Sequence, residues 1–345
     1  MALATYNGSG YLQRQLTSLA EQTLPPFELV VFDDGSDDDT HRIVAAFAAK
    51  APFPVRHQVN AERLGYADNF LAAAQACFGT YIAFCDQDDV WHPQKLERCV
   101  GVLKQEQAVL CTHTAGLIDG DGIAIGSLSQ NITETRVWSA RKLPPWDVFL
   151  GFTQVFDRRL LDLVAPARRG YDNHARGSML AHDRWIYVLG TNLGRTVTLA
   201  EPLAHYRQHG ANLYGGRRKS LMTRLRGKLV GSAEALRTYA SIAAHRAEIF
   251  LDVAERQPDD VFAPEARIAS EWWAEIAATF LKRAELYEHP EFTGRIGRMC
   301  ALLAERLYRP VTRGGLGLNV LFKDIILGVF GLRFSPPMSS KLGSS

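Results

Sequence analysis

The chain has 345 residues, of which 47% are hydrophobic and 22% charged, so a disordered or collagen-like protein is excluded and about two domains are expected. Its net charge of +2 hides an asymmetry, because residues 1–110 hold 14 acidic and 8 basic side chains whereas residues 111–345 hold 23 acidic and 31 basic ones. The five cysteines stand singly, which argues against a disulfide scaffold or a zinc knuckle and favours a reducing compartment.

The first part of the chain alternates short apolar strands with helical patterns. Strands are predicted at 2–5, 27–32, 55–59 and 81–85, and apolar residues at helical spacing indicate helices at 12–19, 43–47 and 70–78. This alternation is typical of a parallel sheet covered by helices. Because ligands bind beyond the carboxyl ends of such strands, we expect the acidic clusters after the second and fourth strands to lie on one rim.

Later segments become increasingly helical. A helix is predicted at 183–189, a strand at 196–200, and long helices at 232–255 and 264–288. Apolar residues at helical spacing from Leu318 to Phe330 predict another helix, which either docks on the core or lies at a membrane interface. No segment has the run of uncharged apolar residues that a membrane span needs and no secretory signal is visible, so a cytoplasmic location is expected.

The second predicted strand ends in the acidic cluster Asp33-Asp34-Gly35-Ser36-Asp37-Asp38-Asp39-Thr40. Aspartate favours helix caps and first turns, so the later members are explained by the start of the next helix. The first two aspartates sit at the strand end itself, where the ligand rim is expected. An EF-hand is excluded, because the glycine comes third in the run and not sixth.

The fourth predicted strand ends in Asp86-Gln87-Asp88-Asp89-Val90-Trp91. These carboxylates repel one another unless a cation or strong donors compensate. Asp86 and Asp88 are placed to face one hard divalent cation such as Mg²⁺, which proteins usually share with substrate phosphates. A solvated turn before a helix that begins near Pro93 is the alternative. No P-loop and no G-x-S-x-G sequence occurs, which disfavours ATPase and serine-hydrolase functions.

Three segments together resemble a family 2 glycosyltransferase of the GT-A fold: Ala4-Thr5-Tyr6-Asn7-Gly8, Leu29-Val30-Val31-Phe32-Asp33-Asp34-Gly35-Ser36, and Tyr81 to Trp91. Downstream, His182-Asp183-Arg184-Trp185 and His205-Tyr206-Arg207-Gln208-His209-Gly210-Ala211-Asn212 are similar to the bacterial rhamnosyltransferase-like branch. The resemblance covers residues 2–215 and implies an α/β, Rossmann-like nucleotide-diphospho-sugar transferase domain with a C-terminal helical extension.

The resemblance implies a donor site on the first two strands. Thr5 and Tyr6 would line the nucleotide pocket, and Asp33 and Asp34 would bind the base and the ribose. The expected donor is a nucleotide-sugar, and the branch similarity suggests dTDP-L-rhamnose.

It also implies the reacting groups. Asp86 and Asp88 match the D-x-D pair that holds the donor through Mg²⁺ or Mn²⁺, and His209 matches a late histidine that completes the metal or diphosphate site. Asp183 matches the catalytic base. Trp185 either stacks on an acceptor ring or belongs to the core.

Sugar transfer by one in-line displacement needs a base on the acceptor hydroxyl and a cation on the departing diphosphate. One base without a carboxylate nucleophile implies inversion at the anomeric carbon. The acceptor is expected to be a glycan or lipid-linked glycan of the cell surface. Alternatives are a UDP-hexose donor, a non-catalytic nucleotide-sugar-binding or scaffolding protein, and a metal-dependent phosphohydrolase.

One position departs from the family pattern. Many members carry arginine in an A-R-N context before the D-x-D strand, where this chain has Ala67-Asp68-Asn69. The positive partner of the diphosphate is therefore unassigned, and His209 or an arginine of Arg217-Arg218-Lys219 is a substitute. His182 is expected to pack or to orient its neighbours.

Residues 217–228 combine basic side chains with leucines at helical spacing. Such a segment suits the surface of an anionic membrane, or equally a solvated helix packed by its leucines. Nucleic acid is disfavoured, because aromatic residues are not interleaved. The predicted organisation is a catalytic domain at 1–215, a helical region at 216–334 that associates with a membrane or packs on a partner, and a disordered tail at 335–345.

Overall fold

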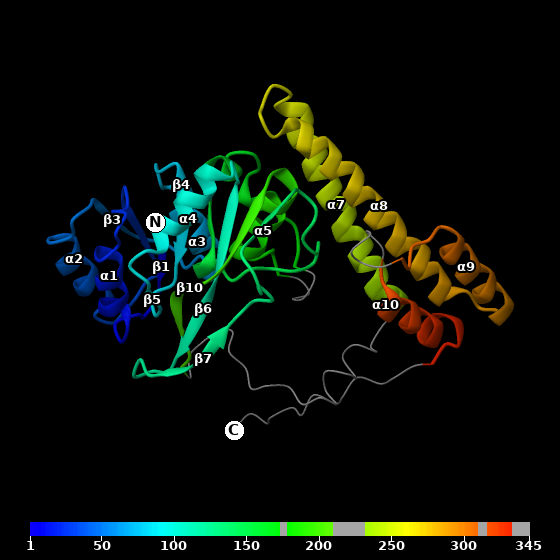
Figure 1. Cartoon of the computed structure of the whole chain (residues 1–345), viewed down its shortest axis with the longest axis horizontal. Coiled ribbons are helices and arrows are strands. Elements are labelled where there is room, and N and C mark those ends of the chain that lie inside the picture. Colours follow the sequence, from blue (N-terminus) through cyan, green and yellow to red (C-terminus); the bar gives the residue numbers. More distant parts are fainter. Residues whose placement is uncertain (173–177, 210–231, 310–315, 333–345) are drawn as a thin grey trace. The chain divides into compact units, whose positions relative to one another are not determined.

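A mixed sheet of ten strands organises the N-terminal part of the computed structural model (Figure 1). Parallel strands lie side by side in the order β3 (Val55–Val59), β2 (Leu29–Asp33), β1 (Ala2–Thr5) and β4 (Tyr81–Cys85). The sheet continues through β9 (Val155–Asp157), β6 (Leu110–Ile118), β10 (Thr196–Arg207) and β5 (Val90–Trp91), while β7 (Ala124–Leu128) pairs with β6 and β8 (Arg136–Trp138) with β10. The four strands predicted in the first part of the chain are thereby confirmed.

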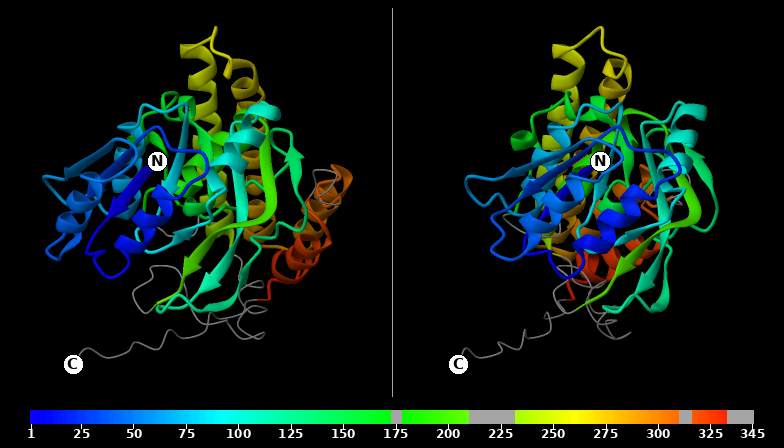
Figure 2. Two further views of the ribbon diagram at one scale, coloured as in Figure 1. Left: turned by 60° about the vertical axis from the view of Figure 1, so that its left-hand side comes forward. Right: turned by 90° about the vertical axis from the view of Figure 1, so that its left-hand side faces the viewer.

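Helices cover this sheet, as two views of the ribbon show (Figure 2). They are α1 (Leu12–Ala20), α2 (Thr40–Ala48), α3 (Tyr66–Gln75), α4 (Lys95–Gln105) and α5 (His182–Leu193), with short turns η1 (Gly151–Thr153), η2 (Arg158–Leu161) and η3 (Pro166–Arg168). The apolar faces of α1 and α4 pack on the strands in one core, in which Leu12, Leu16, Leu19, Cys99 and Leu103 are fully buried.

The structure describes residues 1–172, 178–209, 232–309 and 316–332. The chain divides into two compact units, one comprising Met1–Leu213 and Ile249–Ala269, the other Tyr214–Glu248 and Ser270–Ser345. The predicted boundary at 215, the basic segment 217–228 and the tail 335–345 lie outside the described residues. Part of the predicted helical region, 249–269, packs with the first unit; there Arg141 pairs with Glu265 at 2.6 Å.

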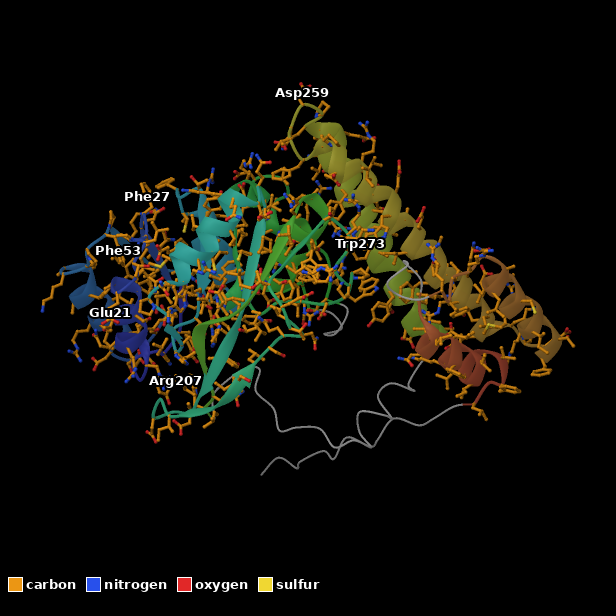
Figure 3. The ribbon with its side chains drawn as sticks, viewed as in Figure 1. Glu21, Phe27, Phe53, Arg207, Asp259 and Trp273 are labelled. Atoms are coloured by element: carbon orange, nitrogen blue, oxygen red, sulfur yellow. The ribbon has the colours of Figure 1, made fainter. Side chains whose placement is uncertain are left out.

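The second unit is built from helices. Its described residues include parts of α7 (Ala233–Arg256) and α8 (Ala263–Glu288), together with α9 (Phe292–Ala304), α10 (Leu318–Lys323) and the π-helical η5 (Asp324–Val329). Trp273 on α8 is labelled in Figure 3, and its side chain is completely buried. Among the described residues, no helix has both the length and the apolar character that crossing a bilayer requires.

A buried carboxylate anchors the last helical segment. Asp324 is fully buried and accepts hydrogen bonds from Arg283 at 2.7 and 2.9 Å and from the hydroxyls of Tyr287 and Tyr308, each at 2.7 Å. Charge and hydrogen bonding together offset the cost of removing the carboxylate from water. One face of the predicted Leu318 to Phe330 stripe is therefore docked on neighbouring helices.

Replacing Arg283 by methionine is expected to lower the free energy of unfolding by about 3–5 kcal/mol, because Asp324 then stays buried without its counter-charge. The matched control is Lys282→Met, since the Lys282 pair with Glu305 is 47% and 45% exposed. That change is expected to cost less than about 1 kcal/mol. Urea unfolding followed by circular dichroism measures both variants, and equal losses would contradict the anchoring role of the buried pair.

Candidate active site

The two acidic clusters lie at the same edge of the sheet. In the parallel register Thr5 is opposite Asp33 on β2, and Leu3 is opposite Cys85 on β4. Because β1 lies between β2 and β4, the residues that follow all three strands emerge together, as the sequence predicts.

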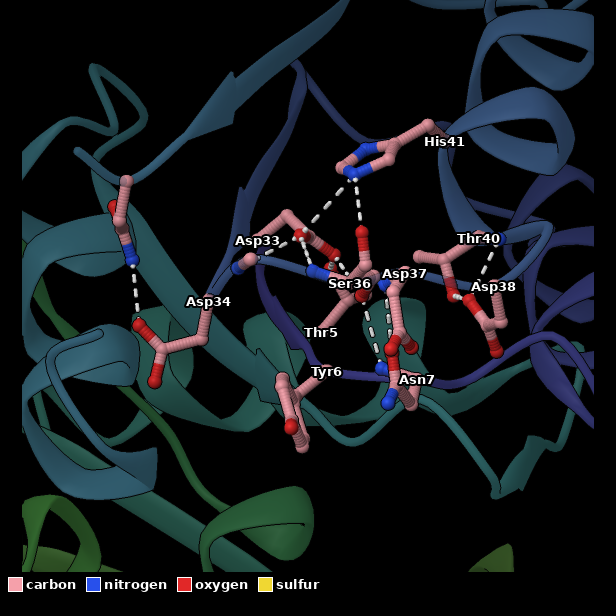
Figure 4. A network of polar contacts seen from close by, with 12 residues as sticks. Thr5, Tyr6, Asn7, Asp33, Asp34, Ser36, Asp37, Asp38, Thr40 and His41 are labelled. Carbon is pink, nitrogen blue, oxygen red and sulfur yellow. Dashed lines mark hydrogen bonds and ion pairs between the residues drawn. The ribbon is translucent and has the colours of Figure 1, made fainter. Parts of the chain in front are cut away.

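Asp33 organises the turn after β2 (Figure 4). Its Oδ1 accepts hydrogen bonds from the N–H groups of Gly35 and Ser36, at 3.0 and 2.7 Å. Its Oδ2 accepts from the hydroxyls of Thr5 and Ser36, at 2.7 and 2.6 Å. Burial would raise the pKa of Asp33, but the hydrogen bonds from Ser36 and Thr5 lower it. The polar side-chain atoms of Thr5 and Asp33 are thus used in hydrogen bonds that hold the turn at the rim.

Asp34 faces a different loop. It accepts hydrogen bonds from the backbone N–H groups of Leu64 and Gly65, each at 2.7 Å. Beside it, the Tyr6 ring is 39% exposed, and the Arg63 guanidinium lies 3.8 Å from the centre of that ring and 3.9 Å from the Asp34 carboxylate. Asp34 itself is buried and also accepts a hydrogen bond from the Asn60 side chain at 3.0 Å, so the exposed group at this place is the Tyr6 ring.

The structure brings Asp183, from the first turn of α5, close to the cluster after β4. Burial and, to a smaller extent, the nearby charges of Asp88 and Asp183 together raise the pKa of Asp86 to about 7. These side chains come from distant parts of the sequence, so the fold itself creates their crowding.

Asp183 is a carboxylate with a raised pKa. Burial raises its pKa to about 6, against the opposing effect of a hydrogen bond that its Oδ1 accepts from the Arg184 N–H at 2.7 Å. The Arg184 side chain in turn pairs with Asp172 at 3.3 Å. A carboxylate with a pKa near neutrality is able to take up a proton at physiological pH, which is what activation of a hydroxyl requires.

The end of β10 is tied to the D-x-D turn by two side chains. His209 Nε2 lies 2.8 Å from Asp88 Oδ2, and its ring centroid is 4.7 Å from that of Tyr11. The buried Arg207 donates from Nε to the Asp88 carbonyl at 2.8 Å, and its backbone N–H donates to Asp89 Oδ1 at 3.1 Å. Figure 3 labels Arg207 at this end of the strand. Sequence patterns identified His209 as a candidate site residue but gave Arg207 no role. Arg207 lies next to Asp88 and Asp89 because β10 pairs with β5, the strand that follows the D-x-D turn.

Two further residues brace the turn. Gln87 forms a reciprocal pair with the Tyr6 backbone: its Oε1 accepts from the N–H at 2.9 Å and its Nε2 donates to the carbonyl at 3.0 Å. Lys95 is completely buried, donates to the Phe152 carbonyl at 2.5 Å and lies 3.3 Å from the centre of the Trp91 ring. Burial lowers the pKa of Lys95 to about 8, opposed by charges that include those of Asp86 and Asp89. Its positive charge therefore offsets part of the negative charge of Asp86 and Asp89.

Two aromatic predictions from the H-D-R-W segment have opposite outcomes. His182 packs as expected: its ring stacks on Phe70 at 4.1 Å, and burial lowers its pKa to about 3, which keeps it neutral. Trp185 is completely buried, so the suggestion that it stacks on an acceptor ring is wrong, and its alternative assignment to the core is correct. Trp185 therefore lies on a buried side of α5.

Asp68, the position that departs from the family pattern, has a structural partner. Its Oδ1 lies 2.6 Å from Arg169 Nη2, and the buried Arg169 also donates from Nε to the Leu180 carbonyl at 2.6 Å. The pair links the first turn of α3 to the loop before α5. Residues 217–219, offered as substitutes for the missing arginine, lie outside the described residues.

The donor atoms present fit a hard divalent cation. In the described part of the chain no three His, Cys, Asp or Glu side chains converge as a complete cage. Mg²⁺ and similar ions need no such cage when substrate phosphates supply ligands. Asp86 and Asp88 offer oxygen ligands, burial and the neighbouring charges of Asp88 and Asp183 raise the pKa of Asp86, and His209 contacts the Asp88 carboxylate. These residues would hold the ion together with a diphosphate.

Residues 2–163 match the family model described as Glycosyl transferase family 2. An uncharacterized glycosyltransferase, alr2836, of Nostoc sp. (strain PCC 7120 / SAG 25.82 / UTEX 2576) is 31% identical over 61% of this chain and 64% of its own length, so the chain spans less than two thirds of that relative. The dTDP-rhamnosyl transferase RfbG of Shigella flexneri is 30% identical over 29% of this chain and 36% of its own length. The crystal structure of S. aureus TarS 1-349 in complex with UDP-GlcNAc is 18% identical, covers 82% of this chain and 80% of its own, and has a TM-score of 0.49.

Replacing Lys95 by methionine is expected to lower the free energy of unfolding by about 1–3 kcal/mol, because the Phe152 carbonyl loses its donor and the cluster loses its buried cation. Lys104→Met, an exposed position on the same helix, is the control and is expected to be nearly neutral. Thermal unfolding compares the two variants. If the methionine at position 95 proves as harmless as the control, the compensating role is refuted.

Proposed function

We propose, from the premise that residues 2–163 form a glycosyltransferase family 2 domain of the GT-A fold, that the chain transfers a sugar from a nucleotide-sugar to an acceptor hydroxyl. The observation that carries this proposal is the convergence of Asp183 on the Asp86 and Asp88 pair at the carboxyl edge of the sheet. The reaction requires a base for the acceptor hydroxyl and a site for a cation on the diphosphate. Asp183 is suited to the first of these functions, and the Asp86 and Asp88 pair to the second.

The nucleotide is proposed to bind beside β1 and β2. The exposed Tyr6 ring offers a stacking surface, and Asp34, which binds the N–H groups of Leu64 and Gly65, fixes the loop beside it, where the base and the ribose are proposed to lie. Thr5 and Asp33 contribute by holding the turn. L-rhamnose from dTDP-L-rhamnose is the proposed donor sugar, on the strength of the H-D-R-W and H-Y-R-Q-H segments and of the partial similarity to the Shigella protein.

The departing diphosphate is proposed to be held at Asp86 and Asp88, with His209 beside them, through Mg²⁺ or Mn²⁺. The bound ion would supply positive charge that stabilises the leaving diphosphate as the bond to the anomeric carbon breaks. Arg207 fixes the backbone of Asp88, so the carboxylate is presented in a set orientation.

Asp183 is proposed to remove the proton from the acceptor hydroxyl. The hydroxyl oxygen forms a bond to the anomeric carbon, the bond from that carbon to the diphosphate oxygen breaks, and the nucleoside diphosphate leaves with the electron pair. Because the attack is a single displacement by the acceptor, the configuration at the anomeric carbon is inverted. The acceptor is proposed to be a glycan or a lipid-linked glycan of cell-surface polysaccharide synthesis.

Asp183→Asn is expected to lower kcat by about 10²–10⁴-fold and to change donor affinity only a few-fold, because the amide cannot accept the proton. The carboxylate must be ionised to act, so wild-type activity is expected to fall as the pH drops through about 6, the raised pKa of Asp183. Asp162→Asn, an exposed carboxylate paired with Arg158, is the control. Turnover and pH profiles measured on released nucleoside diphosphate test this, and an undiminished rate in Asp183→Asn refutes the assignment.

Asp88→Ala is expected to abolish the Mn²⁺-dependent part of donor binding, because the cation loses an oxygen ligand. Calorimetric titration of dTDP-L-rhamnose and of UDP-hexoses, each with Mn²⁺ or with a chelator, measures it. Equal binding with and without Mn²⁺ in the wild type would contradict the metal role. Tighter binding of a UDP-hexose would replace the proposed donor, and tight binding without turnover would favour a nucleotide-sugar-binding protein.

A further inference from the structure

Tyr66, the first residue of α3, lies on the inward-facing side of that helix and yet is 40% exposed. Phe70 and Ala73, which follow it at helical spacing, share this side and are buried. The Phe70 ring lies 5.6 Å from the Phe84 ring on β4, so this side of α3 packs on the sheet. The Tyr66 ring therefore lies where the cover over α3 ends, and part of its surface is open to a ligand.

The contacts of this first turn place it at the rim, between the turn after β2 and the start of α5. The N–H of Gly65 donates to Asp34 Oδ2 at 2.7 Å. On the other side, the Tyr66 ring meets the His182 ring edge to face, with centroids 6.1 Å apart and an interplanar angle of 79°. His182 directly precedes Asp183 in α5. Tyr66 thus lies between the loop where the nucleotide is proposed to bind and the proposed base.

Polar contacts fix the backbone that carries Tyr66. The buried Asn69, in the same turn, donates from Nδ2 to the Phe32 carbonyl at 3.0 Å. The Asp68 carboxylate is held by its 2.6 Å contact with Arg169. An aromatic ring on an anchored backbone loses little conformational freedom when a ligand packs on it. This turn is therefore suited to binding the flat, apolar face of a ligand ring.

We propose that the Tyr66 ring packs against the apolar face of the pyranose that is transferred, and that it thereby selects the donor sugar. This inference rests on the proposed function: in a single displacement the transferred sugar lies between the departing nucleotide and the base, which is the place that Tyr66 borders. A pyranose has C–H groups on its faces and hydroxyl groups at its edge, so an aromatic ring recognises the face. A 6-deoxy sugar such as rhamnose adds a methyl group to that apolar surface.

Calorimetric titration of the full chain in Mn²⁺ separates binding of the sugar from binding of the nucleotide. The probes are matched pairs, dTDP-L-rhamnose with dTDP and UDP-glucose with UDP. Tyr66→Ala is expected to raise the Kd of the nucleotide-sugar ~5–10-fold, because the pyranose loses its aromatic contact. The Kd of the matching nucleoside diphosphate is expected not to change. Tyr66→Phe keeps the ring and is expected to bind both members of a pair as the wild type does.

Phe78→Ala is the matched control, because Phe78 is 72% exposed and lies beyond the opposite end of α3. It is expected to leave both Kd values unchanged, and circular dichroism checks that every variant is folded. Tyr66→Ala protein that binds the nucleotide-sugar as tightly as the wild type would overturn the inference while the proposed function stands. An equal loss of affinity for the nucleoside diphosphate would also overturn it, because Tyr66 would then contact the nucleotide.

Two further results are decisive. A loss in Tyr66→Phe as large as that in Tyr66→Ala would refute packing on the ring in favour of a role for the tyrosine hydroxyl. Wild-type protein that binds none of the probes would overturn the proposed function, and this inference with it.

Discussion

Repulsion among the carboxyl groups at the end of β4 governs the polar structure around the candidate site. Asp86, Asp88 and Asp89 follow one another in a tight turn, and Asp183 adds a fourth charge from α5. Burial, together with the charge of Asp86, raises the pKa of Asp89 well above its usual range, so this carboxyl group holds its proton and the cluster carries less charge. The buried ammonium group of Lys95 offsets part of the remaining negative charge. The negative charge that these groups do not offset is concentrated at Asp86 and Asp88. A cation, alone or with a diphosphate, is therefore stabilised most when it binds there.

The scaffold controls the position of this charge through the alignment of three strands. Because β2, β1 and β4 are parallel neighbours, their carboxyl ends meet at one edge. Hydrogen bonds then lock the loops to one another: Gln87 holds the Tyr6 backbone, and Ser9 donates from its N–H to Asp38 at 2.9 Å. A rim braced in this way loses little conformational freedom when a ligand binds, which favours affinity and orientation together.

Sequence patterns predicted those features that depend on neighbouring residues in the chain, namely the first strands and helices and the residues at the strand ends. Apolar periods identified β1 to β4 and the helices between them, and strand-end position identified Asp34 and Asp86 as rim residues. Antiparallel insertions such as β9 were missed, because their three residues leave no periodic signal. Arg207 and Lys95 were missed for another reason: their importance comes from which strand or carbonyl the fold places beside them. Trp185 shows the converse, since proximity in sequence to Asp183 says nothing about which face of α5 a side chain occupies.

One acidic side chain of the second unit, Asp324, contrasts with the carboxylates of the rim after β4. In the first unit, Asp86, Asp88 and Asp183 lie close enough for their charges to act on one another, so negative charge is gathered at the rim after β4. In the second, Asp324 is withdrawn from solvent and matched by Arg283, Tyr287 and Tyr308. The same bonds that stabilise η5 therefore leave Lys323 as the remaining charge of residues 316–332. A charge that would be costly to bury alone thus serves to fix η5 on the neighbouring helices, because its partners are buried with it.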